Sequence, residues 1–521
     1  MSLINQSEKQ ASAPVVGKGE LARVKRPRTH GLLAVDLRSL AAMRIGLGLV
    51  LLCDLGVRAS DLTTWYTDDG VLPRGALLNQ FADRWEWSVH LMGGNAWYQG
   101  ALFGLAGLAT VLFTLGLWTR VATIVTWALL ISMQTRNPMI NDGGDVLLRA
   151  SMFWSIFLPL GARWSLDTHR APPDGASIRD WPFVSVASVA LLFQICMLYV
   201  FSALHKTDVV WWDGRAVDHA LKIDFFITPL GELLRGFPSV TYLMTFATLA
   251  VEALVPLLLF VPDRRGAVRL FMVLTFWSLH VGLGLCLELG HFSYICGALW
   301  IAFLPPQFWD GLAGSWIGRG VRRAAQSAAR GLSDVLGRLP RRAPVQIAPT
   351  VGSSVLVLLI FLYVLMWNVR TLDDDLFEPY FPHAANPLAI VLRLDQRWDM
   401  FAPRPLSEDG WFVIPAKLAD GSEVELLNLS GAAVTWERPR RMALQVSNTR
   451  WRKYLTNLWF RDRAAHRPHY LEWLVARWNA ANPRERRVKE VRLYYMLDRT
   501  IDAPDPGPAE KVMLWETILE E

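Results

Sequence analysis

Residues 183-FVSVASVALLFQICMLYVFSALH-205 decide the fold of this chain. The stretch is apolar from end to end and reaches the length of about 20 residues that a helix needs to cross a hydrocarbon layer of ~30 Å. Further apolar blocks of similar length lie before and after it. They are 39–58, 98–118, 121–135, 146–161, 240–262, 267–287, 292–308 and 351–368. The sequence therefore predicts a mainly α, polytopic transmembrane helical bundle of about nine spans.

The composition agrees with a membrane protein. Among 521 residues, hydrophobic types make up 52% and charged types 19%, whereas soluble proteins contain about 25% charged residues. The net charge of +6 is concentrated in particular loops, which favours a role in membrane orientation and argues against nucleic acid as a partner. Four cysteines, all in apolar segments, are too few for a disulfide scaffold. Residues 1–30 are polar and basic, so no cleavable signal peptide is expected.

The Lys and Arg bias of the loops predicts an inner-membrane protein with a cytoplasmic N-terminus. The basic segment 309–350 has apolar residues at helical spacing, which is typical of an amphipathic helix on the inner leaflet. The predicted organisation is a disordered basic tail over 1–38, a membrane helical bundle over 39–308, a basic amphipathic cytoplasmic segment over 309–350, a last transmembrane helix over 351–369 and an extracytoplasmic α+β domain over 370–521.

The C-terminal region has the patterns of a small α+β domain. An Asp420-Gly421 turn separates the strand-like runs 412–418 and 423–427, which predicts a hairpin. Apolar residues recur at helical spacing over 464–480, and 491–497 reads as a further strand.

Lys206 follows the fifth apolar stretch directly and shares a helix face with Tyr199 and Ser202. A lysine in an apolar pocket can release its proton and act as a base. The alternative is a lysine that extends to the lipid headgroups. Trp211 and Trp212 lie close by in sequence and would form an aromatic wall at the interface.

Other ionisable groups also lie in apolar segments, where retained charges usually have a partner or a function. Glu252 would pair with Arg44 or Arg149, or would handle protons. His280 and His291 are either buried histidines or site residues, and no third ligand at a recognisable spacing supports a metal site.

The loop Asn141-Asp142-Gly143-Gly144-Asp145 predicts a turn with a close backbone approach. Asp145 and Arg149 are one helical turn apart and could pair locally.

Five stretches, taken in order, resemble the HTTM family, whose best-known members are the vitamin K-dependent γ-glutamyl carboxylases. They are Trp65 to Pro73, Trp164 to Asp167, Ser202 to Trp212, His280 to Gly297 and Gln396 to Pro403. Together they lie within residues 39–403.

The resemblance implies that Lys206 is the base that deprotonates vitamin K or menaquinone hydroquinone, with O2 and CO2 as co-substrates if the reaction is carboxylase-like. The carboxylases also carry an Asn-His pair at the start of span four, where this chain has Asn141 and no histidine. Carboxylation, a related quinol oxygenation and another acid–base reaction are therefore all left open. The expected site has Lys206, His205 and His280 as catalytic residues, no metal ligand, and Tyr199, Ser202, Trp211, Trp212, Asn141 and Asp145 as cofactor-binding residues.

Three functions follow from these patterns. The first is a membrane enzyme that uses Lys206 on a lipid quinol in an outward-facing pocket, with an exported peptide or protein as its possible substrate. The second is a non-catalytic membrane protein that binds or matures such a peptide through its outer domain. The third, a transporter, is disfavoured because no inverted repeat and no matching pair of broken helices is visible.

Overall fold

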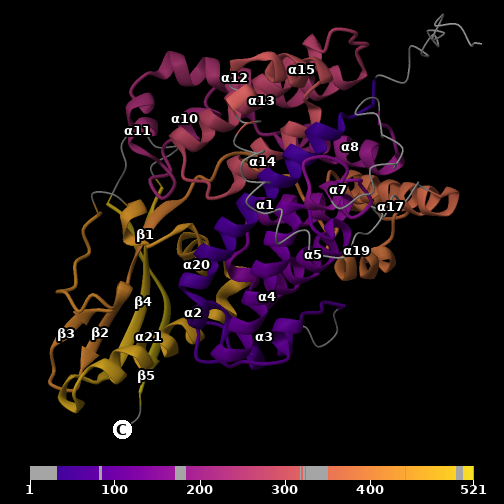
Figure 1. The fold of residues 1–521 in the computed structure, drawn as a ribbon. Helices are drawn as coiled ribbons and strands as arrows, with labels where there is room; N and C mark the ends of the chain where they lie inside the picture. The colour runs from indigo at the N-terminus through magenta and orange to yellow at the C-terminus, as the bar shows by residue number, and fades with distance from the viewer. Residues whose placement is uncertain are drawn as a thin grey trace, which may run out of the picture.

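A long helical bundle and a smaller domain with a β-sheet make up the described part of the chain (Figure 1). The computed structural model describes residues 32–80, 85–169, 183–316, 318–320, 323, 350–439, 442–499 and 508–519. Most of the predicted tail over 1–38 and most of the predicted amphipathic segment over 309–350 lie outside these residues.

Among the residues that the structure describes, six helices are long and apolar enough to cross a membrane. They are α1 (Leu37–Ser60), α4 (Ala96–Leu115), α8 (Val186–His205), α12 (Pro238–Leu254) with the 3-10 turn η3 (Val255–Phe260), α13 (Ala267–Cys286) and α17 (Val351–Arg370). The prediction of a multi-span helical bundle is therefore supported, but the predicted number of about nine spans is not.

The other three predicted spans fall on helices that are too short or too polar. Helix α5 (Thr119–Arg136) carries Thr, Ser and Gln residues among its buried positions, which lowers its hydropathy. Helix α6 (Gly143–Ser155) has 13 residues and is about 20 Å long at 1.5 Å per residue, short of a ~30 Å core. Helix α14 (Phe292–Trp300) and η4 (Ile301–Phe303) are shorter still. A sequence window cannot distinguish such buried helices from true spans.

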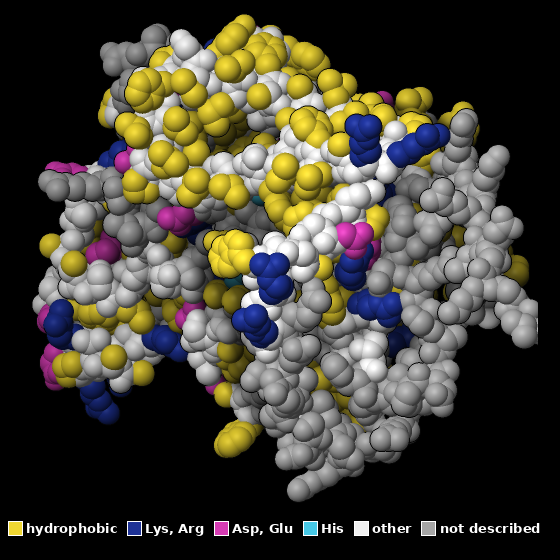
Figure 2. All heavy atoms as spheres, turned by 45° about the horizontal axis from the view of Figure 1, so that its top comes forward, with side chains coloured by type: hydrophobic (Ala, Val, Ile, Leu, Met, Phe, Trp, Pro, Cys, Tyr) yellow, Lys and Arg dark blue, Asp and Glu magenta, His cyan; other side chains and the backbone are white. Residues whose placement is uncertain are grey.

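Helix α8 lies in the centre of the bundle. Of its most apolar window, 72% is buried, against 28% for α12 and α13 and 17% for α17. The exposed surfaces of α12 and α13 carry large apolar side chains, including Leu243, Leu254, Phe271 and Val281. Figure 2 shows the broad hydrophobic surface that results. The chain is thus a multi-pass membrane protein whose outer helices present apolar side chains where lipid would lie.

Helix termini gather at two opposite ends of the bundle. At the far end, Ser39 donates to Leu304 O and Arg269 donates to Ala34 O. At the other end, the amide of Asp208 donates to Pro403 O, and Asn448 of the C-terminal domain donates to Asp61. We call the second end the domain-facing end.

The C-terminal sheet is antiparallel around β4 (Val488–Asp498). Strand β5 (Glu510–Ile518) pairs with β4, and β1 (Asp409–Val413) and β2 (Pro415–Leu418) pair with different halves of β4. Strand β3 (Glu423–Glu425) pairs with β2, which confirms the predicted Asp-Gly hairpin. The predicted strand 491–497 and helix 464–480 are confirmed as β4 and α21 (Arg467–Ala481). Helix α20 (Thr449–Trp459) and strand β5 were not predicted.

Shorter elements connect these parts. Among the helices they are α2 (Leu62–Tyr66), α3 (Arg74–Gln80), α7 (Leu166–His169), α9 (Val209–Trp212), α10 (Ala216–Ala220), α11 (Pro229–Arg235), α15 (Pro306–Gly314), α18 (Asp374–Phe377) and α19 (Asn386–Leu392). The short 3-10 turns are η1 (Val89–Leu91), η2 (Pro138–Ile140), η5 (His383–Ala385), η6 (Leu427–Leu429), η7 (Met442–Gln445), η8 (Arg461–His466) and η9 (Arg484–Arg486).

Candidate functional site

Lys206 is buried at the C-terminal end of α8, with 2% of its surface exposed. Its amine donates to Ser202 Oγ at 2.6 Å, to Ser202 O at 3.3 Å and to Glu252 Oε2 at 2.6 Å. The amine also lies 4.9 Å from the centre of the Trp211 ring. Lys206 therefore does not extend freely to solvent or headgroups. An enclosed cavity beside it stays a prediction, because the cavity described below is not lined by Lys206.

Glu252 of α12 pairs with Lys206, so the predicted pairing with Arg44 or Arg149 is wrong. Arg44 instead donates to the backbone oxygens of Leu160 and Trp164. Arg149 donates to Asp395. Arg44 and Arg149 therefore hold loops against the bundle, and neither contacts Glu252, which pairs with Lys206.

Tyr199 and His280 meet inside the bundle. The Tyr199 hydroxyl lies 2.7 Å from His280 Nε2, and Trp300 Nε1 donates to the same hydroxyl at 2.9 Å. The Phe276 ring stacks on Trp300 with 4.2 Å between centroids. Tyr199 is within electrostatic reach of Glu252, which links this aromatic group to the lysine pair. The other ring nitrogen of His280, Nδ1, is buried and has no hydrogen-bond partner.

Two of the predicted site residues point elsewhere. His205 Nε2 lies 3.2 Å from Thr371 Oγ1, beyond the end of α17. Trp212 is 64% exposed, whereas Trp211 is buried and donates to Phe401 O. The predicted aromatic wall is therefore reduced to Trp211 on the side of Lys206.

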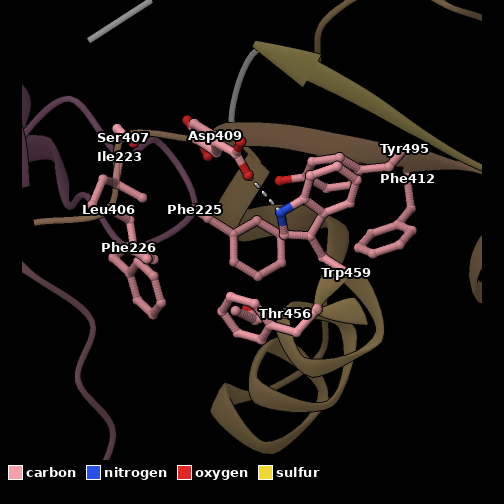
Figure 3. Close-up of a pocket in the computed structure, with 12 residues that line it drawn as sticks. Ile223, Phe225, Phe226, Leu406, Ser407, Asp409, Phe412, Thr456, Trp459 and Tyr495 are labelled. Carbon is pink, nitrogen blue, oxygen red and sulfur yellow. Dashed lines mark hydrogen bonds between the residues drawn. The ribbon is translucent and has the colours of Figure 1, made fainter. Parts of the chain in front are cut away.

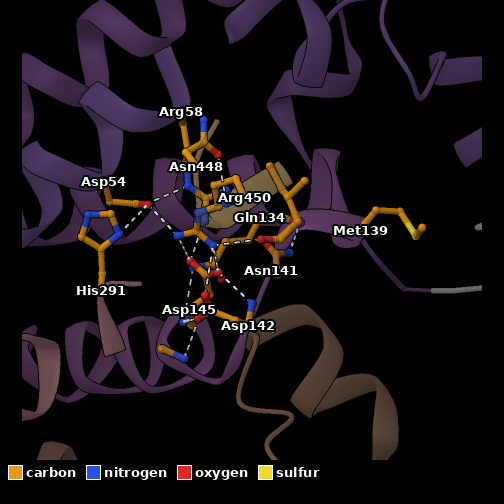
Figure 4. Close-up of polar contacts among 12 residues, drawn as sticks. Asp54, Arg58, Gln134, Met139, Asn141, Asp142, Asp145, His291, Asn448 and Arg450 are labelled. Carbon is orange, nitrogen blue, oxygen red and sulfur yellow. Dashed lines mark hydrogen bonds and ion pairs between the residues drawn. The ribbon is translucent and has the colours of Figure 1, made fainter. Parts of the chain in front are cut away.

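A second group of buried charges joins α1, α6 and α20 at the domain-facing end (Figure 4). Arg58 donates to Asp54 at 2.8 Å and to Asp145 at 2.5 Å. Arg450 of the C-terminal domain donates to Asp54 at 2.6 Å and to Asp145. All four side chains are at most 3% exposed. We call Asp54, Arg58, Asp145 and Arg450 the arginine cluster.

The charges in the arginine cluster balance. Burial and Arg58 lower the pKa of Arg450, but the carboxylates of Asp145 and Asp54 raise that pKa by more. Arg450 therefore stays charged, and two guanidinium groups neutralise two carboxylates. His291 also approaches the cluster, with Nδ1 3.7 Å from Asp54 Oδ1.

The loop over 141–145 supports this cluster rather than the lysine. Asp145 pairs with Arg58 and Arg450, so its predicted local pairing with Arg149 is wrong. Asn141 donates to Gln134 O at 2.7 Å. The sequence predicted that Asn141 and Asp145 bind the same cofactor as Tyr199 and Ser202. In the structure their contacts lie in and around the arginine cluster instead.

Sequence reasoning did not single out Asp54, Arg58 or Arg450. The signal for the first two was present, because an Asp and an Arg four residues apart inside an apolar segment can pair along a helix. Arg450 had no such signal, since it lies 396 residues from Asp54 in a segment with many arginines. In the part of the chain that the structure describes, no group of three or more His, Cys, Asp or Glu side chains could hold a metal ion.

Comparisons with known proteins give one result. No curated protein and no solved structure matches the chain. The model of the HTTM domain matches residues 33–309, which extends from α1 into the first turn of α15 and includes Lys206, Glu252 and His280. Since this match extends over just over half of the 521 residues, the chain belongs to the HTTM family.

Proposed function

We propose that the protein is a membrane enzyme in which Lys206 acts as a general base on a lipid hydroquinone, such as vitamin K or menaquinone hydroquinone, in order to modify an exported peptide. The observation that carries the proposal is the contact at 2.6 Å between the buried Lys206 amine and the partly buried Glu252 carboxylate. A buried arginine would hold such a carboxylate at least as well, but only a lysine can release its proton.

The base must be a neutral amine before it can accept a proton. Glu252 is positioned to take one proton from the Lys206 ammonium over a single hydrogen bond. Ser202 Oγ would then hold the amine in place. In this scheme Lys206 takes a proton from an acidic hydroxyl of the bound ligand, and Glu252 stores the proton that Lys206 released.

The surroundings suit a ring with polar hydroxyls. Tyr199, Phe276 and Trp300 supply aromatic faces, and the unpartnered Nδ1 of His280 is a buried polar atom that could bond a hydroxyl. Lys206, Tyr199 and His280 are the residues that we propose hold the hydroquinone head. When bound, this group would supply the oxygen-dependent chemistry that protein side chains lack.

Carboxylation with CO2 is not part of the proposal. The 141–145 loop lacks the histidine of the carboxylases, and its Asp145 is fully engaged by Arg58 and Arg450. A quinol oxygenation or another proton abstraction would need only Lys206 and the residues around it, and not the 141–145 loop.

The test is turnover of a reduced quinone by the full chain in lipid nanodiscs. Wild type should consume menahydroquinone in the presence of oxygen, and Lys206→Arg should reduce the rate at least 100-fold while the protein stays folded, because general-base catalysis contributes about 10²–10⁴-fold. Lys222→Met is the matched control, since Lys222 lies in the loop after α10 and pairs with Asp218. Full activity of Lys206→Arg, or no turnover of any hydroquinone by wild type, would overturn the proposal. Mass spectrometry of co-purified lipids should also find a quinone that is depleted in Lys206→Ala.

A second candidate function is binding of an exported peptide without catalysis. The supporting observation is that Lys206 already has protein acceptors on Ser202 and Glu252, as in a structural ion pair. If this is correct, Lys206→Met/Glu252→Met should bind the peptide as well as wild type does.

We also propose that the domain-facing end is extracytoplasmic in the inner membrane. The support is the concentration of Lys and Arg in the loops of the far end and in 309–350. A reporter that is active only outside the cytoplasm, fused after Glu521, should be active, and an inactive fusion would reverse the orientation.

A further inference from the structure

A cavity of about 120 Å³ lies in the C-terminal domain where the loop after α10 meets the sheet and α20. Six of its lining side chains are aromatic or aliphatic and largely buried. These are Ile223, Phe225, Phe226, Phe412, Trp459 and Tyr495. Figure 3 shows the rings of Phe225, Trp459 and Tyr495 gathered around one space. This cavity is separate from Lys206, which does not line it.

The rings form a rigid wall. Trp459 and Tyr495 stack with 4.3 Å between centroids, and Phe412 meets Tyr495 edge to face at 5.0 Å. Faces of Trp and Tyr rings carry partial negative charge and attract organic cations. The wall therefore suits an apolar stem that ends in a positive charge.

Carboxylates line the same cavity. Glu408 and Asp409 both contribute to its lining, and the Asp409 carboxylate accepts from the amide of Asp224 at 2.8 Å. Arg438 partly neutralises the negative charge on this side of the cavity. It pairs with Asp224 at 2.6 Å and lies 3.7 Å from Asp409.

Glu408 is the carboxylate that is left for a ligand. It is exposed and accepts one hydrogen bond, from Trp459 Nε1 at 3.1 Å. No ion pair of Glu408 occurs within the described ranges of the chain. A cation lying over Trp459 would thus meet the Glu408 carboxylate at the edge of the same ring.

A cavity of about 150 Å³ holds benzene, so a cavity of about 120 Å³ has room for a slender aliphatic stem but not for the fused rings of a naphthoquinone. A charged head on such a stem would lie at the edge of the cavity, where Glu408 is exposed. We propose that this cavity binds an arginine or lysine side chain of a peptide segment, with the stem against Phe225 and the Trp459–Tyr495 wall and the cationic head at Glu408. The inference rests on the proposed function in one respect, namely that the peptide is the exported substrate.

The test compares the peptide acetyl-Gly-Gly-Arg-Gly-Gly-amide with its citrulline counterpart, which has the same shape and no charge. Binding to the full chain in nanodiscs is followed by saturation-transfer NMR. The arginine peptide should bind at least tenfold more tightly than the citrulline peptide, and added salt should reduce this difference. Glu408→Gln should lower the arginine affinity to the citrulline level and leave the citrulline affinity unchanged. Trp459→Leu should weaken both.

The control variant is Glu485→Gln, an exposed glutamate elsewhere in the same domain, which should change neither affinity. Equal binding of the two peptides, or an unchanged arginine affinity in Glu408→Gln, would overturn the proposal. Loss of the wild-type signal in phosphatidylethanolamine discs, with retention in phosphatidylglycerol discs, would assign the cavity to a lipid amine and also overturn it. Because no turnover is measured, failure here leaves the Lys206 experiment unaffected.

Discussion

The arginine cluster and the Lys206–Glu252 pair are both buried at the domain-facing end of the bundle, yet they are built differently. In the cluster, two guanidinium groups bridge two carboxylates of different helices, and each arginine contacts both Asp54 and Asp145. In the pair, one amine meets one carboxylate and one serine. Guanidinium keeps its charge in proteins, whereas a lysine can lose its proton when burial disfavours the ion. The cluster is therefore a fixed joint, whereas the pair contains the lysine for which we propose proton transfer.

The largest effect is expected from breaking the joint. Arg450→Met leaves two buried carboxylates with only Arg58, and should lower the free energy of unfolding by about 3–5 kcal/mol. Arg450→Lys should also be strongly destabilising, because one ammonium cannot reproduce the forked contacts to Asp54, Asp145 and Ile140 O. Thermal unfolding in nanodiscs measures both, with the exposed Arg484→Met as control. Equal midpoints for Arg450→Met and Arg484→Met would mean that the cluster does not stabilise the fold.

Breaking the pair should cost less, and the cost should depend on the replacement. Glu252→Lys places two cations together and should lower the free energy of unfolding by about 3 kcal/mol. Glu252→Gln keeps an acceptor for the Lys206 amine, so a loss of about 1 kcal/mol is expected. Thermal midpoints of the two variants test this order. Equal stability of the two variants would show that the side chain at 252 reaches water or headgroups.

Asp409 is a further buried carboxylate, and it differs from those of the cluster and the pair in its distance from a cation. The nearest guanidinium, that of Arg438, lies 3.7 Å from the Asp409 carboxylate. Burial raises the pKa of Asp409 to about 7, against the lowering effect of Arg438 and of two backbone amides. The folded protein therefore holds this proton more tightly than the unfolded chain does, and ionisation of Asp409 lowers stability as the pH rises between 4 and 7.

Between pH 5 and pH 7, wild type should lose about 2 kcal/mol relative to Asp409→Asn, as calculated from 1.36 kcal/mol per pKa unit. The difference between the two proteins isolates Asp409 from Glu408, Asp224 and Asp498, which surround it in both. Thermal unfolding midpoints across this range measure the difference. Parallel pH profiles would show that Asp409 is already ionised at pH 5.

The sequence predicted the features that depend on neighbours along the chain. The apolar length of 183–205, the Asp420-Gly421 hairpin and the helical spacing over 464–480 all led to the correct elements. Tyr199, Ser202 and Lys206 were correctly placed on one helix face, because α8 is a regular helix up to His205.

Features that depend on the packing of distant segments were not predictable in this way. The sequence offered Arg44 and Arg149 as partners for Glu252, whereas the packing of α12 against α8 brings Glu252 to Lys206. The apolar segment 146–161 was predicted to span the membrane, but it falls on the 13-residue helix α6. A short helix that is fully buried in protein is as apolar as a spanning helix. Arg450 lay in a domain whose contact with the bundle no local pattern revealed.

The long sequence separation within the arginine cluster has a consequence for synthesis of the chain. Asp54, Arg58 and Asp145 leave the ribosome 305 residues or more before Arg450 does. At about 5–20 residues per second, the nascent bundle waits roughly 15–60 s with two carboxylates and one guanidinium in an apolar setting. During that interval it carries one uncompensated negative charge, which Arg450 neutralises once α20 has been made and packs against the bundle.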